Sequence, residues 1–371
     1  MIKILFYIDE LTAGGAEKVL CNLVNNMDPS VFDITVHTTW KSDAESLLKP
    51  HVKYKYVYSK RNQTNKFFYR AETQLGLFYQ LHLKDNYDIE VAYLECGPTK
   101  VMASSTNKKA AHIAWIHCDL EKKFSDMNSF VNKTRNQYKK YDRVICVSEE
   151  CNKTYQKYLS DCAPSQVLHN VIDDEEILRK AEMEPAVPIS KTKLTAIAVG
   201  RMTDQKNYMM LLEVHKQLID EGNDYELWFV GDGPDLHRLK EYVKENSLDN
   251  SVQFYGFQSN PYPYMKKADV LVCSSKYEGY STVAIEALIL GLPIVTVDCT
   301  GMKEIFGNNG FGIITKNTKS ALFAGIAEFL NNEKLRSNYA HFAAVRGKQF
   351  SAWEAVKQSN DMFIQIEENK K

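Results

Sequence analysis

The sequence has no hydrophobic run long enough to cross a membrane. The apolar start of the chain ends at Asp9, which leaves it too short for a signal peptide or a spanning helix. No other stretch reaches the roughly 18 consecutive apolar residues that a spanning helix needs. We therefore expect a cytoplasmic protein that is soluble or lies peripherally on the inner face of the cytoplasmic membrane.

Paired cysteines are also missing. The chain has eight cysteines, but none form a CxxC pair or follow a metal-ligand spacing. Most of them lie in apolar runs such as Val144–Val147, where a free thiol behaves as a small hydrophobic side chain. This pattern predicts reduced core thiols in a cytosolic protein and no metal site built from cysteine.

A strong charge of either sign is absent as well. The formal net charge is −1, so the molecule as a whole has no field that would gather nucleic acid. Hydrophobic residues make up 44% and charged residues 25% of the chain, the balance of a soluble globular enzyme. A length of 371 residues fits two α/β domains of moderate size.

Short apolar runs alternate with amphipathic helical segments along the whole chain. Strands buried on both faces and separated by helices predict parallel, doubly wound sheets. The fold class expected is α/β, with two Rossmann-like domains facing a cleft at the carboxyl ends of their strands. The expected strands are Ile2–Ile8, Phe32–Thr38, Ile89–Leu94, Ala111–Ile116, Arg143–Val147, Leu194–Val199, Glu226–Val230, Val252–Tyr255, Val270–Cys273 and Ile294–Val297.

The expected boundary lies in a stretch with prolines, acidic residues and little apolar periodicity. Its run Asp173–Glu176 is interpreted as solvated linker charge. The last segment, Ser351–Glu367, is amphipathic and could cross back to the first domain. Two domains are expected: residues 1–170, which bind the acceptor, and residues 194–350, which bind the nucleotide sugar. A linker at 171–193 joins them, and a terminal helix covers 351–371.

Two glycine-rich loops follow strands, but neither is a dinucleotide fingerprint. Gly14 and Gly15 lie between the first strand and the helix Ala16–Met27, where backbone N–H groups can approach anionic oxygens. The third glycine of GxGxxG is missing here, and it is also missing after Gly231–Pro234. A nicotinamide dinucleotide site is therefore disfavoured, and a tight turn alone is the alternative for the first loop.

Cations and carboxylates follow two strands of the second half. Arg201 and Lys206 come after a strand and before a helix, where a guanidinium and an ammonium suit a diphosphate. Glu278 and Glu286 have seven residues between them, one before a helix and one inside it. They could accept hydrogen bonds from sugar and ribose hydroxyls while the helix N-terminus faces phosphates. Solvated surface charges are the alternative for both groups.

These motifs together resemble the family 4 retaining glycosyltransferases of GT-B fold, of the bacterial surface-polysaccharide type. The resemblance covers nearly the whole chain, with the motifs in family order. It includes Gly14–Glu17, Val147–Glu149, Asn170–Asp173, Val199–Asn207, Val230–Pro234 and Tyr277–Gly307.

The resemblance implies a role for each matching residue. Arg201 and Lys206 would bind the donor diphosphate, Glu278 the transferred sugar and Glu286 the ribose. His117, after a strand, would contact the donor sugar. Tyr255, Gly256 and Phe257 would lie along the nucleobase. The residues expected at the donor site are His117, Arg201, Lys206 and Glu278 as catalytic groups, and Gly14, Gly15, Gly200, Arg201, Lys206, Tyr255, Gly256, Phe257, Glu278, Ser281, Thr282, Val283 and Glu286 as binding groups.

The sequence departs from the family pattern at one place in this site. Ser281 and Thr282 stand where many members have a glycine and a bulky apolar residue. The backbone role of the loop survives this change, but the preferred sugar is harder to read from the sequence.

The resemblance also implies the reaction. A hexose or N-acetylhexosamine would move from a nucleotide-diphosphate sugar, expected to be a UDP-sugar, to a saccharide acceptor that is lipid-diphosphate-linked. No cofactor is expected besides this donor substrate, and the absence of an Asp-x-Asp motif predicts catalysis without an essential metal. Two alternatives remain: a nucleotide-sugar epimerase of the same fold and a non-catalytic sugar-nucleotide-binding subunit.

Residues 53–70 combine six basic side chains, six aromatic side chains and no acidic one. Basic residues with interleaved aromatics suit an anionic bilayer surface. The same composition could stack single-stranded nucleic acid, or it could be an ordinary strand and helix with a solvated face. For a glycosyltransferase the membrane surface is favoured, and no nucleic-acid partner is expected.

Overall fold

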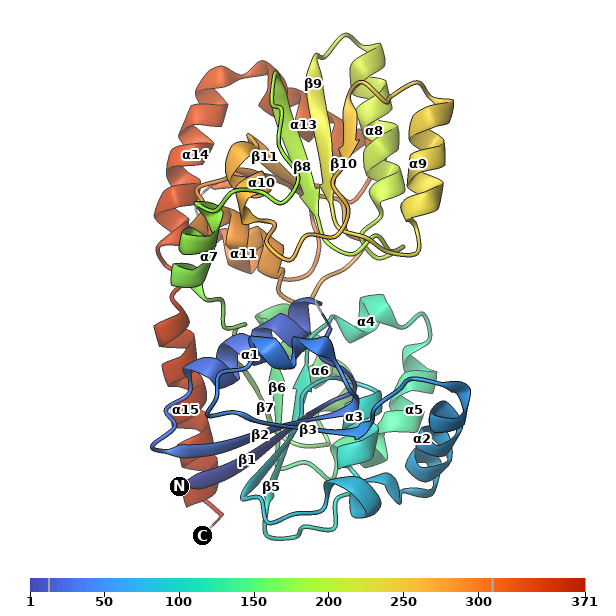
Figure 1. The fold of residues 1–371 in the computed structure, drawn as a ribbon, viewed down its shortest axis with the longest axis vertical. Helices are drawn as coiled ribbons and strands as arrows, with labels where there is room; N and C mark the ends of the chain where they lie inside the picture. Colours follow the sequence, from blue (N-terminus) through green and yellow to red (C-terminus); the bar gives the residue numbers. More distant parts are fainter. Residues whose placement is uncertain (13, 308–309, 371) are drawn as a thin grey trace. The chain divides into compact units, whose positions relative to one another are not determined.

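The computed structural model describes residues 1–12, 14–307 and 310–370. The chain divides into two compact units (Figure 1). The N-terminal unit contains Met1–Val171 and Ala352–Lys371, and the C-terminal unit contains Ile172–Ser351. Each unit is built on one parallel sheet with helices between its strands, which confirms the expected α/β class.

The N-terminal unit has a seven-stranded sheet in the order β3-β2-β1-β4-β5-β6-β7. The chain first winds to one side of β1 and then to the other, so β1 and β4 are neighbours where the winding reverses. Ligands of open parallel sheets bind at the carboxyl ends of the strands at this point. The strands are β1 (Ile2–Ile8), β2 (Phe32–Trp40), β3 (Lys53–Tyr58), β4 (Ile89–Ala92), β5 (Ala111–Ile116), β6 (Arg143–Cys146) and β7 (Ser165–Val167).

Helices or short helical turns lie between consecutive strands, since parallel neighbours need a crossover connection. The sheet is buried because apolar residues fill both of its faces, and five consecutive residues of β1 are fully buried. The helices of this unit are α1 (Gly15–Asn26), α2 (Gln63–Leu75), α3 (Gly97–Met102), α4 (Leu120–Lys123), α5 (Met127–Tyr138), α6 (Glu149–Leu159) and α15 (Ala352–Glu368), with single turns at η1 (Asp43–Leu47) and η2 (Tyr79–Leu83).

Helix α15 returns to the N-terminal unit late in the chain. It packs beside α1, and its Phe363 is fully buried. The Phe363 ring lies edge-on to Phe6 of β1 at 5.7 Å and to Phe32 of β2 at 6.3 Å between ring centroids. Such edge-to-face contacts add to the burial of apolar area. The core of this unit is therefore shared by the first and the last elements of the chain.

The C-terminal unit has a six-stranded sheet in the order β10-β9-β8-β11-β12-β13, and its winding reverses between β8 and β11. Its strands are β8 (Leu194–Val199), β9 (Tyr225–Val230), β10 (Val252–Phe254), β11 (Val270–Cys273), β12 (Ile294–Val297) and β13 (Gly312–Thr315). Its helices are α7 (Asp174–Ala181), α8 (Tyr208–Asp220), α9 (Leu236–Glu245), α10 (Tyr262–Lys267), α11 (Thr282–Ile289), α12 (Met302–Phe306), α13 (Lys319–Asn331) and α14 (Glu333–Gly347).

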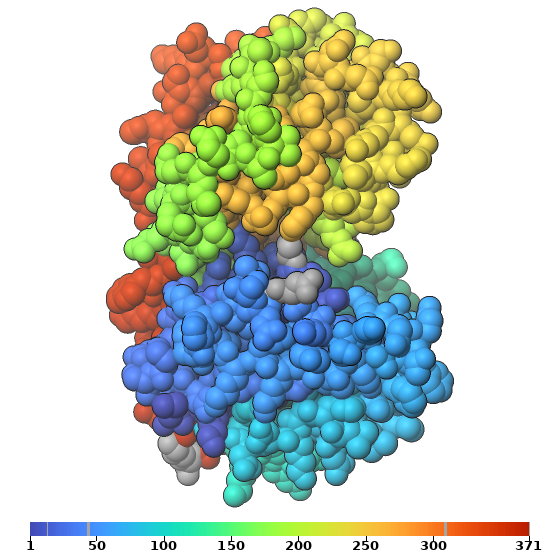
Figure 2. All heavy atoms as spheres, in the orientation of Figure 1, coloured from blue at the N-terminus to red at the C-terminus, as the bar shows by residue number. Residues whose placement is uncertain are grey.

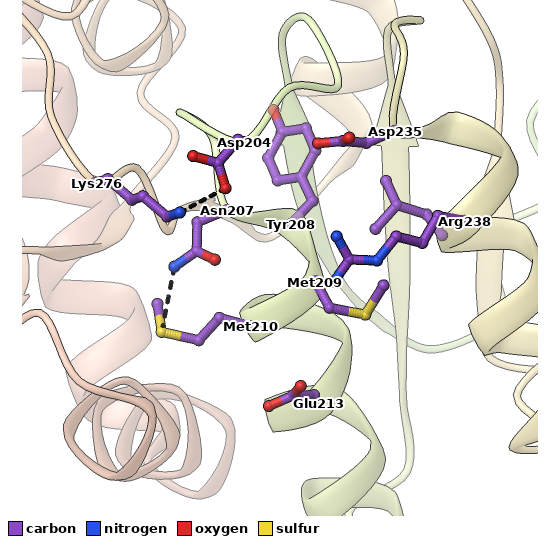
Figure 3. Close-up of a pocket in the computed structure, with 10 residues that line it drawn as sticks. Asp204, Asn207, Tyr208, Met209, Met210, Glu213, Asp235, Arg238 and Lys276 are labelled. Atoms are coloured by element: carbon purple, nitrogen blue, oxygen red, sulfur yellow. Dashed lines mark hydrogen bonds and ion pairs between the residues drawn. The ribbon is translucent and has the colours of Figure 1, made fainter. Parts of the chain in front are cut away.

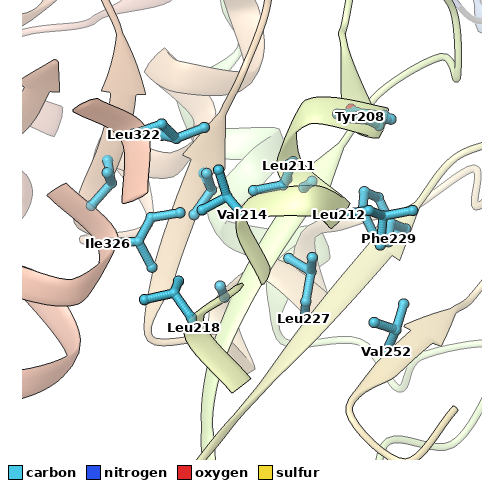
Figure 4. Packing of buried hydrophobic residues seen from close by; sticks show 14 of the residues in the cluster. Tyr208, Leu211, Leu212, Val214, Leu218, Leu227, Phe229, Val252, Leu322 and Ile326 are labelled. Carbon is cyan, nitrogen blue, oxygen red and sulfur yellow. The ribbon is translucent and has the colours of Figure 1, made fainter. Parts of the chain in front are cut away.

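One cluster of buried apolar side chains packs helices against the C-terminal sheet (Figure 4). Helices α8 and α13 contact each other and cover one sheet face with Leu211, Val214 and Ile326. Leu227 and Phe229 of β9 point into the same cluster. Full burial of such a side chain contributes about 1.5–3 kcal/mol. This rigid layer holds the loops at the carboxyl ends of β8 and β11.

The stretch expected as a linker contains a helix. Asp173 accepts a hydrogen bond from the backbone N–H of Glu176 at 2.9 Å and so caps α7. Acidic residues fill the first turn of α7 and basic residues the last, which suits the helix dipole. The acidic run is therefore a helix start rather than linker charge.

Candidate functional site

Two loops meet at the carboxyl ends of the C-terminal sheet, one after β8 and one after β11. Ser274 donates its hydroxyl to the carbonyl of Lys206 at 2.8 Å. The backbone N–H of Lys276 donates to the carbonyl of Gln205 at 2.8 Å, and the Gln205 side chain donates to the carbonyl of Tyr277 at 2.9 Å. The two loops are thus joined by hydrogen bonds to their backbone carbonyls, at the point where the winding of the sheet reverses.

A buried ion pair lies between these loops. The Lys206 Nζ is 2.7 Å from the Glu278 Oε1, and the two side chains are 18% and 12% exposed. Ser275 donates its hydroxyl to the same carboxylate oxygen at 2.7 Å. Burial lowers the pKa of Lys206, but the Glu278 carboxylate more than offsets this and raises the pKa above its ordinary value. The ammonium therefore stays charged at neutral pH.

Glycines let the surrounding loops approach the pair closely. A Cβ on Gly200, which has φ +143°, would lie 3.1 Å from the Lys206 Cε. Gly231, with φ +147°, packs against the backbone of Gly200, and its Cβ would lie 2.0 Å from the Gly200 carbonyl oxygen. A side chain at either position would displace the loop that carries Lys206.

The N-terminus of α11 follows Glu278 directly. Ser281 is the N-cap residue, but its side chain caps no backbone N–H. The Ser281 hydroxyl is buried and has no hydrogen-bond partner within the described parts of the chain. Thr282 and Val283 begin the helix, where free N–H groups and the helix dipole favour an anion.

Glu286 lies inside α11 and is 5% exposed. The Tyr262 hydroxyl of α10 donates to the Glu286 Oε1 at 3.3 Å. A carboxylate this deeply buried needs hydrogen-bond donors, and Tyr262 supplies one of them. This geometry keeps the Glu286 carboxylate in a fixed direction.

Arg201 differs from Lys206 in its surroundings. Its side chain is exposed, and no described residue forms an ion pair or a side-chain hydrogen bond with it. The structure therefore joins Lys206 to Glu278, but it leaves Arg201 free at the surface of the same loop.

The expected nucleobase residues also differ from one another. Tyr255 is 8% exposed and packs on Trp228 and Tyr264, at 5.5 and 4.7 Å between ring centroids. Gly256 has φ +68° and accepts a hydrogen bond from the backbone N–H of Gly231, which joins the loops after β9 and β10. Phe257 is 58% exposed. Of these three residues, only Phe257 offers a free ring.

A separate hollow of about 350 Å³ borders the same β8–α8 loop (Figure 3). In it, Lys276 pairs with Asp204, while Asn207 contacts Met210. None of the expected donor residues lines this hollow. Its lining residues are Asp204, Asn207, Tyr208, Met209, Met210, Glu213, Asp235, Arg238, Leu239 and Lys276.

The glycine loop of the N-terminal unit opens α1. Gly14 is the N-cap residue and Gly15 the first helical residue, while Ala13 between Thr12 and Gly14 lies outside the described residues. A Cβ on Gly14 would lie 2.3 Å from a carboxylate oxygen of Glu17. The Glu17 side chain also accepts a hydrogen bond from the Thr12 hydroxyl at 3.2 Å. Gly14 thus lets Glu17 fold back over the start of the helix.

His117 follows β5 and contacts the ring of Tyr93, at 4.6 Å between centroids. Its Nε2 is buried with no partner among the residues described. Burial lowers the pKa of His117 to about 4, so the imidazole is neutral at physiological pH. It can therefore donate or accept one hydrogen bond, but it does not act as a cation.

Glu95 holds the loop on which His117 lies. Its Oε2 accepts the backbone N–H of His117 at 3.1 Å, and its Oε1 is 2.6 Å from the Lys123 Nζ. Burial raises the pKa of Glu95, but Lys123 and the His117 contacts outweigh it and bring the pKa to about 2. Glu95 is thus a buried anion that fixes the ends of β4 and β5.

The described residues contain neither a candidate metal cluster nor a candidate membrane-spanning helix. No three histidine, cysteine, aspartate or glutamate side chains within them are grouped so that they could hold a metal ion. Likewise, none of the helices that the structure describes combines the length and the apolar character needed to span a bilayer.

Comparison with known proteins places the chain in a family. The model "Glycosyltransferase Family 4" matches residues 13–176, and the model "Glycosyl transferases group 1" matches residues 179–346. The two matches together span nearly all of both units. The chain belongs to the family 4 glycosyltransferases. The family that the motifs indicated is thereby confirmed.

This glycosyltransferase is similar to curated glycosyltransferases of bacteria. It is 26% identical over 360 residues to the N-acetylgalactosamine-N,N'-diacetylbacillosaminyl-diphospho-undecaprenol 4-alpha-N-acetylgalactosaminyltransferase of Campylobacter jejuni, covering 94% of this chain and 96% of that one. It is 30% identical over 167 residues to the amylovoran biosynthesis glycosyltransferase AmsD of Erwinia amylovora, covering 45% and 47%.

Solved structures agree with the GT-B fold. Anabaena HepE in complex with UDP and glucose has a TM-score of 0.77 at 18% identity, covering 98% of this chain and 100% of that one. Sucrose-phosphate synthase from Thermosynechococcus elongatus has a TM-score of 0.80 at 16% identity, with 99% of each chain covered.

The structure adds residues that the sequence analysis of this glycosyltransferase missed. Ser275 binds Glu278, Tyr262 binds Glu286, and Glu95 binds the His117 loop. Ser275 could have been found, because it follows a predicted strand three residues before Glu278. Tyr262 and Glu95 carry no such signal, since only the folded sheet brings them to their partners.

The ion pair yields a stability prediction. Lys206→Met leaves the buried Glu278 carboxylate without its cation, which costs about 3 kcal/mol. We expect the melting temperature of the C-terminal unit to fall by roughly 6–12 °C in calorimetry.

Lys276→Met is the matched control, because it breaks the neighbouring pair with Asp204, whose side chains are 45% and 85% exposed. Its effect should stay within about 1 kcal/mol. Combining Lys206→Met with Glu278→Gln should restore part of the stability. Equal losses in the two single variants would contradict a structural role for the Lys206–Glu278 pair.

Proposed function

We propose that this glycosyltransferase moves a hexose or N-acetylhexosamine from a UDP-sugar to a lipid-diphosphate-linked saccharide, with retention of anomeric configuration and without an essential metal. The observation that carries the proposal is the Lys206–Glu278 ion pair at the carboxyl ends of β8 and β11. It places a fixed cation and a fixed hydroxyl acceptor side by side, as a sugar diphosphate requires.

Lys206 can serve the diphosphate without giving up Glu278. An ammonium has three donor hydrogens, and the hydrogen bond to Glu278 uses one of them. The remaining hydrogens can bind phosphate oxygens, together with Arg201 and the N–H groups that begin α11. Fixed donors aimed at charge that develops on a leaving group stabilise the transition state by several kcal/mol.

The carboxylates suit the neutral parts of the donor. Glu278 has its Oε1 bound to Lys206 and Ser275, so its Oε2 is directed to a sugar hydroxyl in the proposed complex. Glu286, oriented by Tyr262, would accept the ribose hydroxyls. The exposed Phe257 ring is suited to lie along the uracil, whereas Tyr255 would support it from the core.

The proposed reaction needs no residue as covalent nucleophile. The bond between the sugar C1 and the diphosphate oxygen breaks, and a bond from C1 to the acceptor oxygen forms on the same face. The acceptor proton passes to an oxygen of the departing diphosphate. His117 is neutral and would contact the sugar as a hydrogen-bond partner.

Names of relatives support the finer parts of this proposal. The Campylobacter jejuni relative is named as a 4-alpha transferase acting on a diphospho-undecaprenol saccharide, and a Bacillus subtilis relative is named a poly(glycerol-phosphate) alpha-glucosyltransferase. An α product from an α-linked UDP-sugar means retention. HepE was solved with UDP and glucose, which supports uridine in the donor.

We expect retention to be visible directly. The protein is screened with UDP-glucose, UDP-galactose and their N-acetylated forms by thermal shift, since a ligand of the folded state raises the melting temperature. Product formed from the best donor is then followed by proton NMR, and the new glycosidic bond should be α. A β product would contradict retention, conversion of the UDP-sugar into an isomeric UDP-sugar without acceptor would favour an epimerase, and binding without turnover would favour a non-catalytic subunit.

Arg201 provides the cleaner test of the diphosphate site, because it is exposed and makes no contact that folding needs. Arg201→Ala should lower kcat at least tenfold while the melting temperature stays unchanged. Arg238→Ala, an exposed arginine of α9 that lines the separate hollow, is the matched control and should keep wild-type turnover. Equal kinetics of both variants and wild type would remove Arg201 from the site.

We further propose that α2 lies on an anionic membrane surface. Of the six basic residues in 53–70, Lys53, Lys55 and Arg61 pair with acidic residues of the same unit. Lys60, Lys66 and Arg70 have no such partner in the described structure.

Helix α2 has no fully buried residue, and its Phe67 and Leu75 are 68% and 71% exposed. Figure 2 shows atoms of this blue-coloured stretch at the surface of the N-terminal unit. Free cations beside exposed apolar side chains suit an interfacial helix. This surface would keep the enzyme at the inner face of the cytoplasmic membrane, where a lipid-linked acceptor is found.

Vesicle cosedimentation tests this surface. The protein should pellet with vesicles containing phosphatidylglycerol at low salt, and less so at high salt, because screening weakens the attraction. Phe67→Ser combined with Leu75→Ser should reduce binding at least fivefold. Leu178→Ser, which changes an exposed leucine of α7, should not. No pelleting at low salt would argue for a soluble acceptor.

A further inference from the structure

A second carboxylate lies at the point where the winding of a sheet reverses, this time in the N-terminal unit. Asp9 directly follows β1, and Gly97 follows the neighbouring strand β4. Open parallel sheets bind ligands at the carboxyl ends of these strands. The donor residues named above lie in the other unit, after β5 or at the start of α1, and none of the contacts described for them involves Asp9, so they do not account for it.

One oxygen of Asp9 is firmly held. The Tyr69 hydroxyl of α2 donates to the Asp9 Oδ1 at 2.9 Å, and the Thr39 hydroxyl of β2 donates to the same oxygen at 3.3 Å. Thr39 is fully buried and also bonds the Tyr7 hydroxyl. Three elements of the unit thus fix the direction of this carboxylate.

The other oxygen is not used. The half-buried Asp9 Oδ2 takes no hydrogen bond from any residue within the described ranges. Burial removes water from the charged form of Asp9 and so raises its pKa. A carboxylate that has lost water yet keeps a free acceptor oxygen calls for an external hydrogen-bond donor.

The backbone beside Oδ2 approaches this oxygen closely. A Cβ on Gly97 would lie 2.6 Å from the Asp9 Oδ2, so any other residue would push the carboxylate out of its position. The preceding residue, Cys96, has φ +71°, a strained value for a residue with a side chain. Strain of this kind is concentrated at binding and catalytic sites.

The charges nearby select a neutral ligand group. The Asp9 carboxylate and Glu10 next to it would repel a phosphate, and the Arg61 guanidinium, 2.8 Å from Glu10, would disfavour a free cation. The Arg61 guanidinium lies over the Trp40 ring, at 5.8 Å from its centroid. A hydroxyl is the donor that matches a fixed carboxylate oxygen in such surroundings.

We infer that the Asp9 Oδ2 binds a hydroxyl of the acceptor saccharide, with Tyr69 and Thr39 as positioning residues and Gly97 as the residue whose lack of a side chain lets the carboxylate keep its position. This inference rests on the proposed function. It assigns the N-terminal unit a defined contact to a hexose ring rather than to the lipid or the diphosphate of the acceptor.

The test separates acceptor binding from donor chemistry. Decyl glycosides of glucose, N-acetylglucosamine and N-acetylgalactosamine serve as acceptor probes, and slow hydrolysis of the UDP-sugar without acceptor reports on the donor site. Asp9→Asn should lower kcat/KM for the decyl glycosides at least tenfold, mainly through the acceptor KM. The donor KM and the hydrolysis rate should stay within twofold.

Three further variants sharpen this result. Tyr69→Phe should weaken acceptor use less than Asp9→Asn does, since it frees Oδ1 without removing Oδ2. Gly97→Ala should raise the acceptor KM with every charge unchanged. Glu10→Gln removes the adjacent carboxylate and is the matched control, which should keep wild-type acceptor kinetics.

Several outcomes would overturn the inference. These are unchanged acceptor kinetics in Asp9→Asn, an equal loss in Glu10→Gln, a parallel loss of donor hydrolysis in a folded Asp9→Asn variant, and a wild-type enzyme that hydrolyses donor but glycosylates none of the probes. A wild-type protein that neither binds UDP nor hydrolyses any UDP-sugar would instead refute the proposed function.

Discussion

The C-terminal unit depends on keeping one buried ammonium charged. Lys206 can remain charged only because Glu278 lies 2.7 Å away, and the two residues are 72 positions apart in sequence. Their loops must therefore be aligned by the adjacent strands β8 and β11, by the glycine contact between Gly200 and Gly231, and by Ser275. A buried pair of this kind fixes the relative positions of its two loops more than it adds to the net stability of the fold.

The same constraint appears in both units in different forms. Each sheet reverses its winding next to its first strand, and each carries a carboxylate there, Glu278 in one and Asp9 in the other. Glu278 is neutralised by a cation from its own unit, which suits a site for an anionic ligand. Asp9 is instead held by hydroxyls and keeps a free oxygen. The same topology thus suits an anionic ligand group in one unit and a neutral hydroxyl in the other.

Much of the fold could be predicted because fully buried strands read as plain apolar runs. The bounds expected for β1, β5, β8, β11 and β12 are those of the structure. Strand β3 lacked that signal, because its alternating lysines and tyrosines leave it largely exposed. Helix α7 was missed because charges placed for capping and for the helix dipole resemble a solvated linker in sequence.

The residues of the candidate site were visible in sequence as motifs, but their partners were not. Lys206 and Glu278 each stood in a recognisable loop, yet the pair between them needs the strand order. Asp9 had no motif, since a single acid after a strand only marks where an apolar run ends. Its significance comes from Tyr69 and Gly97, which lie 60 and 88 residues away in sequence and meet it only in the folded sheet.

The position of Phe363 has a consequence for synthesis of the chain. Domains usually fold in order as the ribosome releases them, at about 5–20 residues per second. Here the rings of Phe6 and Phe32 can pack against Phe363 of α15 only after the entire C-terminal unit has been synthesised. The C-terminal unit can therefore complete its core before the N-terminal unit does. The sheet of the N-terminal unit is thus translated first, but its core is completed last.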